Sequence, residues 1–171
     1  MEHALASYLR QVWDKDDCLY EGQHEFRTGY SCESQIIAVC QDIADSLDNG
    51  DRIDAIIVDF SKTFSLVPHC RLFSKIPNSD VGSSLVVWIR EFLVGRTQRV
   101  RVEGQLSQEV SVTSGVQQGS VLGPLLFLAY VNDIWSNMAS TIRIFTDNCI
   151  SYRKITKNED KNFAEISGQA M

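Results

Sequence analysis

Two aspartates that follow apolar segments are the residues of this chain best suited to chemistry. Asp59 comes near the end of the apolar run IDAIIVDF, and Asp147 precedes Asn148 between two shorter apolar runs. A carboxylate at the end of a buried strand is unfavourable unless it is solvated, paired or bound to a cation. Two convergent carboxylates are what magnesium-dependent phosphoryl transfer requires, because Mg²⁺ prefers hard oxygen ligands. Spacing alone leaves a second interpretation open, in which one aspartate ends a strand and the other only forms a turn.

Short strands are the elements that would bring the two aspartates together. Residues 53–60 are rich in β-branched side chains, which predicts a central, buried strand. Residues 142–145 and 149–152 are shorter apolar runs, and they predict a hairpin whose turn contains Asp147 and Asn148. Neighbouring strands of one sheet would place the two aspartates side by side.

Amphipathic patterns predict three helices, over residues 1–14, 32–47 and 84–93, and an apolar run predicts a fourth, over residues 121–134. Ser31 is the expected N-cap of the second helix, whose apolar residues share one face: Ile36, Cys40, Ile43 and Leu47. The third helix groups another apolar set: Leu85, Trp88, Ile89 and Phe92. Pro124 fits the fourth helix only if it falls in the first turn, because proline lacks a backbone N–H.

A polar hairpin and a glycine-rich loop precede the last helix. Residues 97–113 predict the hairpin, with Glu103 and Gly104 near its turn. Arg99 and Arg101 alternate with valines on it, and therefore we expect them to share one face. The loop SGVQQGSVLGP follows directly. The order of helices, strands and hairpins predicts an α+β domain with an antiparallel sheet.

Composition narrows the class of protein. The chain has 171 residues, of which 44% are hydrophobic, so we expect one folded domain or a piece of a larger one. The net charge of −6 argues against binding nucleic acid through bulk charge alone, although local basic patches still permit it.

The cysteines and the apolar runs indicate the compartment. The five cysteines include no C-x-x-C pair, which argues against zinc. Their odd number, with an N-terminus that lacks the pattern of a secretory signal, predicts reduced thiols and an intracellular location, with nucleus or cytoplasm left open. The longest strongly apolar run, VLGPLLFLAYV, is too short to span a bilayer, so we expect no membrane partner.

Five segments, in a fixed order, carry a more specific pattern. They read QHEFRTGYSCESQ, DAIIVDFSKTFSLVPH, WIREFLVGRTQRVRVEG, VTSGVQQGSVLGPLLFLAYVNDI and IRIFTDNCISYR. Together they closely resemble the reverse transcriptase domain of LINE-type, non-LTR retrotransposons, over roughly residues 22–155. Residues 59–69 match most of the family pattern D-F-S-K-A-F-D-x-V-P-H. Residues 114–127 match S-G-V-P-Q-G-S-V-L-G-P-L-L-F at all but one position.

This resemblance implies a right-hand polymerase fold, as a fingers-palm fragment with an antiparallel palm sheet and with the thumb missing. Residues 1–21 would form an N-terminal helix and connector, residues 22–155 the fingers and palm, and residues 156–171 a polar tail. The family copies RNA into DNA. The implied partners are therefore an RNA template, a DNA primer and deoxynucleoside triphosphates, with Mg²⁺ or Mn²⁺ as the cofactor.

The resemblance assigns catalytic roles to residues that match its motifs. Asp59 and Asp147 would hold two metal ions, and Asn148 stands at the third catalytic position, where the family usually reads F-A-D-D. Two such ions can activate an attacking hydroxyl group and stabilise the leaving oxygen.

Further residues would bind the nucleotide and the nucleic acid. The implied nucleotide-binding residues are Phe60 and Ser61 through main-chain N–H groups, Phe64 as a gate that excludes a 2′-hydroxyl, Gln118 and Gly119 near the template, and Arg27. The implied nucleic-acid contacts are Arg96, Arg99 and Arg101. Plainer alternatives exist: the phenylalanine belongs to the core, the arginines form a solvated face, and the glycine serves a turn.

Several positions depart from the family pattern. Asn148 offers a neutral carbonyl oxygen where the family has a carboxylate. Thr63 replaces an alanine, Ser65 replaces an aspartate and Gln117 replaces the loop proline. We therefore carry two hypotheses. One is a truncated RNA-directed DNA polymerase domain whose activity is weakened or lost, and the other is a non-catalytic retrotransposon remnant with at most weak nucleic-acid binding.

Overall fold

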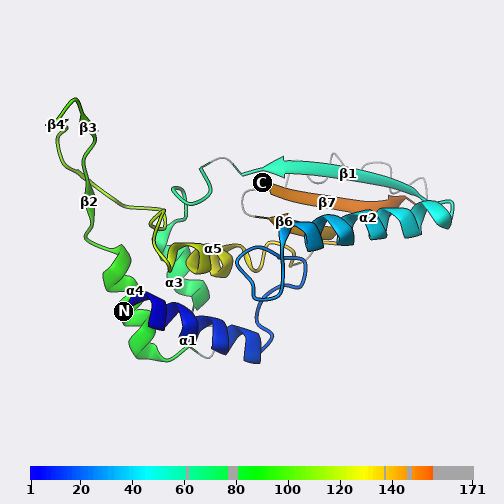
Figure 1. Cartoon of the computed structure of the whole chain (residues 1–171), viewed down its shortest axis with the longest axis horizontal. Helices are drawn as coiled ribbons and strands as arrows, with labels where there is room; N and C mark the ends of the chain where they lie inside the picture. The colour runs from blue at the N-terminus through cyan, green and yellow to red at the C-terminus, as the bar shows by residue number, and fades with distance from the viewer. Residues whose placement is uncertain (61, 77–80, 137, 146–147, 156–171) are drawn as a thin grey trace. The chain divides into compact units, whose positions relative to one another are not determined.

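The chain folds into two compact units, each built from helices and antiparallel strands (Figure 1). The computed structural model describes residues 1–60, 62–76, 81–136, 138–145 and 148–155. The first unit contains Met1–Leu19 and Lys62–Asn132, and the second contains Tyr20–Ser61 and the chain from Asp133 onward. The mixed α+β class predicted from the sequence is confirmed. The predicted division after residues 21 and 155 stays a prediction.

The second unit is built on a three-stranded antiparallel sheet in the order β1-β7-β6 (Figure 1). Its strands are β1 (Arg52–Asp59), β6 (Thr141–Phe145) and β7 (Asn148–Ile155). The long central strand β7 pairs with β1 from Arg52 opposite Ile155 to Asp59 opposite Asn148. The last pair therefore brings two predicted catalytic positions next to each other.

The prediction of a central, buried strand at residues 53–60 is wrong. Strand β1 lies at an edge of the sheet, and none of its residues is fully buried. Ile57 is 75% exposed, whereas Val58 packs against the core cluster of Ile142, Ile144 and Cys149. A run of β-branched residues does not distinguish a strand covered on both faces from one covered on a single face, because both need apolar side chains.

The hairpin predicted around Asp147 and Asn148 forms, and its second strand begins one residue earlier than predicted. Asn148 is the first residue of β7 and pairs with Phe145, the last residue of β6. Thr146 and Asp147 lie outside the described residues. Asn148 therefore has the extended backbone of a strand residue, and its position is set by pairing with two strands.

Helix α2 (Cys32–Asp48) packs along the sheet of the second unit (Figure 1). It begins as predicted, because the Ser31 side chain accepts a hydrogen bond from the Ser34 backbone N–H at 3.2 Å. The apolar face predicted for this helix is exposed at three of its members: Ile36, Cys40 and Leu47. The buried residues of α2 are the polar Gln35 and Ser46.

A polar link joins α2 to the sheet. The Arg143 guanidinium of β6 donates to Asp42 of α2, with 2.8 Å between Nη2 and Oδ2. The Tyr152 hydroxyl of β7 donates to the same carboxylate oxygen. Partly buried charged groups need partners of this kind, so the link holds Asp42 of α2 against β6 and β7.

Four helices form the core of the first unit: α1 (Glu2–Lys15), α3 (His69–Lys75), α4 (Ser83–Leu93) and α5 (Gly123–Val131). Helix α5 is apolar all round, and Leu125, Leu126, Phe127 and Leu128 are at most 1% exposed. Pro124 lies in its first turn, as predicted. The helix is shorter than the predicted residues 121–134. Helix α3 was not predicted, because a helix of about two turns after a proline shows little periodicity.

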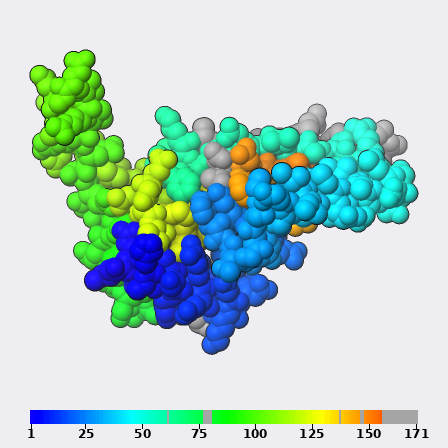
Figure 2. All heavy atoms as spheres, viewed as in Figure 1, coloured from blue at the N-terminus to red at the C-terminus, as the bar shows by residue number. Residues whose placement is uncertain are grey.

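The predicted hairpin forms as two short ladders, and its outer end projects from the rest of the first unit (Figures 1 and 2). Strand β2 (Thr97–Gln98) pairs with β5 (Val110–Ser111), and β3 (Arg101–Val102) pairs with β4 (Gln105–Leu106). Its tip is the predicted Glu103-Gly104 pair, at φ 49° and 85°, as tight hairpin turns require. None of the helices in the described parts of the chain is both long and apolar enough to cross a bilayer.

Candidate active site

Asp59 and Asn148 are cross-strand neighbours at one end of the sheet of the second unit. Asp59 is the last residue of β1, Asn148 is the first of β7, and their Cα atoms are register partners. Both residues are exposed. Side chains of directly opposed residues project from the same face of a sheet, so the carboxylate and the carboxamide point to one side. Asp147, the predicted second metal ligand, lies outside the described residues.

The face of the sheet beside Asn148 is apolar. A mostly apolar cavity of about 250 Å³ is lined by α2 and the strands, and Ile36, Ile57, Phe145 and Asn148 are among the residues that line it. Burial of Cys149, the next residue along β7, raises the pKa of its thiol to about 11. The thiol is therefore protonated at neutral pH.

The oxygen ligands described at this end of the sheet are of the type that a hard cation prefers, but there are few of them. Asp59 supplies a carboxylate and Asn148 a carboxamide oxygen, and Mg²⁺ prefers such oxygen ligands. Within the described ranges, no cluster of three or more His, Cys, Asp or Glu side chains can hold a metal ion. A metal at this end would need a further carboxylate, and Asp147 precedes Asn148 directly in the sequence.

In the second unit, two of the residues predicted to contact the nucleotide, Phe60 and Arg27, make contacts with neighbouring residues of the same unit. The Phe60 side chain packs against the core cluster of the sheet, and Ser61 lies outside the described residues. Arg27 donates from Nη1 to the main-chain carbonyl of Tyr20 at 2.9 Å, and its guanidinium lies 4.6 Å from the centroid of the Tyr30 ring. Arg27 is therefore held within its own segment, and its predicted contact with phosphate stays a prediction.

In the first unit, hydrogen bonds join the glycine-rich loop to the segment that carries Phe64. The backbone N–H of Gly115 donates to Val67 O at 2.8 Å, and that of Val116 donates to Phe64 O at 2.7 Å. The His69 Nε2 atom lies 2.8 Å from Gly115 O. These bonds satisfy buried backbone groups of both segments, so the two predicted motifs form one structural element.

Gly115 is the point of closest approach between these segments. Its φ is 92°, and a Cβ atom at this position would lie 2.8 Å from Ser65 O. Only glycine fits such a site without displacement of the backbone. Phe64 is half-buried, with its ring centroid 5.1 Å from that of Phe127 on α5. Packing against Phe127 thus supports one face of the Phe64 ring, the side chain predicted to exclude a 2′-hydroxyl.

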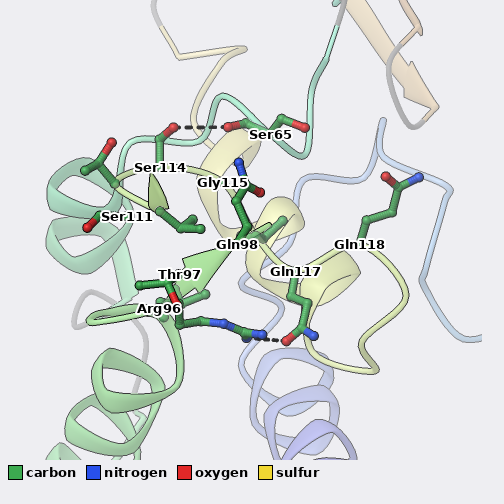
Figure 3. A pocket seen from close by; sticks show the side chains of 13 residues that line it. Ser65, Arg96, Thr97, Gln98, Ser111, Ser114, Gly115, Gln117 and Gln118 are labelled. Atoms are coloured by element: carbon green, nitrogen blue, oxygen red, sulfur yellow. Dashed lines mark hydrogen bonds between the residues drawn. The ribbon is translucent and has the colours of Figure 1, made fainter. Parts of the chain in front are cut away.

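A cavity of about 480 Å³ lies between the base of the hairpin and the glycine-rich loop (Figure 3). The Arg96 guanidinium donates to Oε1 of Gln117 inside it and lies 5.5 Å from the centroid of the Phe92 ring. Gln118 and Gly119 are exposed, and Gln118 points away from Arg96 (Figure 3). The hydrogen bond between Arg96 and Gln117 was not predicted from the sequence. The one sequence feature that could have indicated it is the glutamine at position 117, where the family pattern has proline.

The other two predicted hairpin arginines differ in their surroundings. The Arg99 guanidinium pairs with the Glu109 carboxylate across the hairpin. Arg101 is exposed on β3. The strand pairing is interrupted between Gln98 and Arg101, so the simple alternation assumed for these arginines does not run through one continuous ladder. Their contact with nucleic acid stays a prediction.

Comparison with solved structures defines the fold first. The chain is similar in structure to a telomerase from Candida tropicalis, solved in its apo form and truncated from the C-terminal domain, with a TM-score of 0.65. The match covers 99% of this chain and 36% of the telomerase chain, at 14% sequence identity. The two proteins therefore share a fold, which is that of a reverse transcriptase.

Comparison of sequences then defines the family. A model of the reverse transcriptase (RNA-dependent DNA polymerase) family matches residues 1–167. The chain belongs to this family, and its resemblance to the domain of LINE-type, non-LTR elements is confirmed.

The curated relatives that match are proteins of mobile elements. The chain is 28% identical to a probable RNA-directed DNA polymerase from transposon X-element of Drosophila melanogaster, over 89% of this chain and 17% of that protein. It is 29% identical to one from transposon BS of the same species, over 78% of this chain and 15% of that protein. The chain thus spans about a sixth of the length of these relatives.

Proposed function

We propose that this chain is a fingers-palm part of an RNA-directed DNA polymerase, which extends a DNA primer on an RNA template. The observation that carries this proposal is the register of β1 and β7, which sets Asp59 directly opposite Asn148. Two-metal phosphoryl transfer needs carboxylates that converge from neighbouring strands. Membership of the reverse transcriptase family supports the same reaction.

Asp59 and Asp147 would hold the divalent cations, with Asn148 as a neutral neighbour. When bound, magnesium would supply the positive charge that activates the primer hydroxyl and neutralises the leaving pyrophosphate. The exposed Asp59 carboxylate is open to such a ligand. Asn148 would contribute at most a carbonyl oxygen, so the site would carry one negative charge less than a site with three carboxylates.

The glycine-rich loop and the Phe64 segment would bind the incoming nucleotide. Hydrogen bonds from Gly115 and Val116 hold the backbone of this loop against the Phe64 segment, which provides the rigidity that nucleotide positioning needs. Phe64 would stand beneath the sugar and exclude a 2′-hydroxyl, and Gln118 and Gly119 would lie near the template. Phe60, Ser61 and Arg27 would complete the contacts with the triphosphate.

A second candidate function is a non-catalytic remnant that binds nucleic acid weakly. The specific observation that favours it is the carboxamide of Asn148 at the position opposite Asp59. Loss of a charge beside two cations weakens their binding, because the charges of the ions dominate such a site.

Primer extension on an RNA template, with Mg²⁺ and then with Mn²⁺, separates the two candidates. The native chain would be compared with Asp59→Asn and Asn148→Asp. Asp54→Asn is the matched control, because it removes a carboxylate from the same strand, where Asp54 pairs with Arg52 at 2.8 Å. The polymerase proposal expects extension by the native chain and by the control, and none by Asp59→Asn.

The other outcomes of this experiment also distinguish the polymerase from the remnant. Extension by Asn148→Asp alone would show a competent fold with a defect at position 148. Failure of all four proteins to extend the primer would contradict the polymerase proposal and favour the remnant.

A further inference from the structure

An apolar stripe on α2 is left largely uncovered in the described part of the chain. The α2 stripe recurs at the spacing of one helical face, and it consists of Ile36, Cys40, Ile43 and Leu47. Ile36 is 55% and Leu47 61% exposed, Cys40 is also exposed, and Ile43 is half-buried. A single exposed apolar residue needs no explanation, but a line of them over about three turns indicates a surface that another segment covers.

The α2 stripe continues into the apolar cavity of the second unit, where α2 packs along the sheet (Figure 1). Ile36 and Cys40 line the cavity from the helix, and Ile57 and Phe145 line it from the strands. Its volume of about 250 Å³ lies below the range of roughly 300–1,000 Å³ that is typical of small-ligand sites. A cavity of this size suits large apolar side chains that project from another chain.

The charges around the stripe and the cavity are mainly negative. Helix α2 has neither lysine nor arginine but four acidic residues: Glu33, Asp42, Asp45 and Asp48. On the sheet, Asp59 is exposed and shares one face of β1 with Ile57, two residues before it. Arg143 is the one charged side chain among the described residues that line the cavity, and the Asp42 carboxylate balances it at 2.8 Å.

The whole second unit has the same sign of charge. Its described residues include ten aspartates and glutamates against five lysines and arginines. A positively charged partner is therefore attracted to this unit, and a negatively charged one is repelled. A second copy of the chain would set one acidic helix against another, so the charge selects against it.

A buried acceptor beside the cavity indicates a partner that donates hydrogen bonds. Gln35 lines the cavity and is 6% exposed, and its Oε1 atom accepts no hydrogen bond from the described residues. An unsatisfied buried carbonyl oxygen is unfavourable. The last torsion of a glutamine side chain has a broad minimum, so this oxygen can turn toward a donor that enters the cavity. Lysine and arginine side chains supply donors and no acceptors.

We propose that the α2 stripe and the adjoining cavity bind an amphipathic helix of another protein, with lysine or arginine beside its apolar face. Large apolar side chains of this helix enter the cavity and cover Ile36 and Ile57. Its basic side chains lie against Glu33, Asp48 and Asp59. Recognition of a helix in a groove uses apolar anchors at i, i+3, i+4 and i+7, the same spacing as in the α2 stripe. Binding requires neither catalysis nor a metal ion, so it does not depend on the polymerase function proposed above.

The first test measures the fluorescence anisotropy of two labelled peptides, in EDTA and at low and high salt. Each peptide is about 18 residues long, which allows an isolated helix to form, and carries leucine at the anchor spacing. Lysine occupies the other positions in one peptide, and glutamate occupies them in the second. We expect the lysine peptide to bind about ten-fold or more tightly at low salt, with a smaller difference at high salt. Equal affinities of the two peptides would overturn the proposal.

Two variants locate the binding surface. Ile57→Lys removes an apolar side chain from the cavity, and Val87→Lys makes a similar change at an exposed position of α4 in the first unit. We expect Ile57→Lys to weaken binding of the lysine peptide about ten-fold or more, and Val87→Lys to leave it unchanged. Equal affinities of the two variants would show that the peptide binds elsewhere and would contradict the proposal.

A further measurement uses the unaltered chain, so it does not depend on how a variant folds. Cys40 lines the cavity, Cys70 lies on α3 of the first unit, and both thiols are exposed. Their alkylation by N-ethylmaleimide is followed by mass spectrometry. With the lysine peptide at about ten times its Kd, we expect alkylation to slow about ten-fold at Cys40 and to stay the same at Cys70. Equal rates of slowing, or no change at Cys40, would contradict the proposal.

Analytical ultracentrifugation at pH 7 tests a second copy of the chain as the occupant. We expect the native chain and Ile57→Lys to sediment alike, because the cavity does not bind another copy. A native dimer that is absent in Ile57→Lys and that the lysine peptide does not dissociate would assign the cavity to self-association and overturn the proposal.

Discussion

At the scale of single residues, the chemistry of this chain depends on what stands opposite Asp59. The register places the neutral side chain of Asn148 there, at the end of a sheet whose neighbouring surface is apolar. A second carboxylate at this position would attract a cation strongly, because few other polar groups compete for it. The change from Asp to Asn alters charge while leaving the size of the side chain almost unchanged.

We therefore expect Asn148→Asp to tighten the binding of Mn²⁺ by about ten-fold or more, through one added negative charge beside Asp59. Isothermal titration calorimetry with Mn²⁺ measures this. Asn49→Asp, at the C-cap of α2, is the control for a general change in charge. Equal gains in the two variants would show that the effect does not arise at the sheet end.

At the scale of elements, polar contacts join separate segments within each unit. In the second unit, the Asp42 carboxylate joins α2 to both β6 and β7 through Arg143 and Tyr152. In the first unit, backbone hydrogen bonds join the glycine-rich loop to the Phe64 segment at Gly115. Each contact holds in place a segment that carries proposed functional residues or packs against one that does.

Loss of the Tyr152 hydroxyl should destabilise the second unit. Tyr152→Phe leaves the ring in place and removes one donor to a partly buried carboxylate, which costs about 1–2 kcal/mol of the free energy of unfolding. Urea denaturation measures this value. Tyr8→Phe, on the exposed side of α1, is the matched control and should change stability by less than about 0.5 kcal/mol. A Tyr152→Phe variant as stable as this control would contradict the proposed link.

The same network predicts a dependence of stability on acid. Burial tends to raise the pKa of Asp42, but hydrogen bonds from Arg143 and Tyr152 outweigh it and hold that pKa below its ordinary value. A carboxyl with a lowered pKa in the folded state stabilises the fold above its unfolded pKa of about 3.9, and that contribution disappears as the pH falls through the folded value.

Asp42→Asn should therefore reduce the loss of stability on going from about pH 5 to about pH 3. Urea midpoints measured across this range for both proteins test the effect. Identical pH dependence in the variant and the native chain would show that this carboxyl does not contribute.

A side chain at Gly115 should disrupt the junction of the glycine-rich loop. Gly115→Ala places a Cβ atom at φ 92° and 2.8 Å from Ser65 O, so we expect a loss of about 1–3 kcal/mol in stability. Gly82→Ala is the matched control, because no atom lies within 4 Å of its added Cβ. Thermal unfolding compares the two, and equal melting temperatures would contradict the role assigned to Gly115.

At the scale of the whole molecule, charge and exposed apolar surface set its behaviour in solution. The net charge is −6 at pH 7 and the isoelectric point is about 5.0. Helix α2 and strand β1 carry large exposed apolar residues, with Ile37 67% exposed and Ile57 75% exposed. Exposed apolar patches promote association, most strongly where net charge vanishes.

We expect self-association of the native chain to rise as the pH approaches about 5, and Ile37→Lys to reduce it at pH 7. Light scattering against pH and concentration measures this. Val87→Lys adds the same charge at another exposed apolar position, on α4, and serves as the control. An equal reduction by both variants would assign the effect to charge alone rather than to the face of α2.

Much of the local structure follows from short stretches of sequence. Ser31 predicts the start of α2, Glu103 and Gly104 predict the tip of the hairpin, and Pro124 predicts the first turn of α5. Each depends on backbone preferences and hydrogen bonds within a few residues, which the sequence displays directly. The family is equally visible, because five ordered motifs are specific.

The predictions that failed concern which side of an element is covered. The apolar run of β1 suggested burial on both faces, and the apolar face predicted for α2 is exposed at Ile36 and Leu47. Which face of a helix or strand is buried depends on the elements packed against it, and those come from distant parts of the chain.

The sequence by itself therefore determined the family, the elements with strong local signals and the aspartate that ends β1. Only the tertiary structure decided that Asn148 is the residue opposite this aspartate, and that Gln117 holds Arg96 in a polar cavity. The physical reason is that strand register and side-chain hydrogen bonds join residues far apart in the chain. Their partners are selected by packing of the whole unit rather than by the pattern of any one segment.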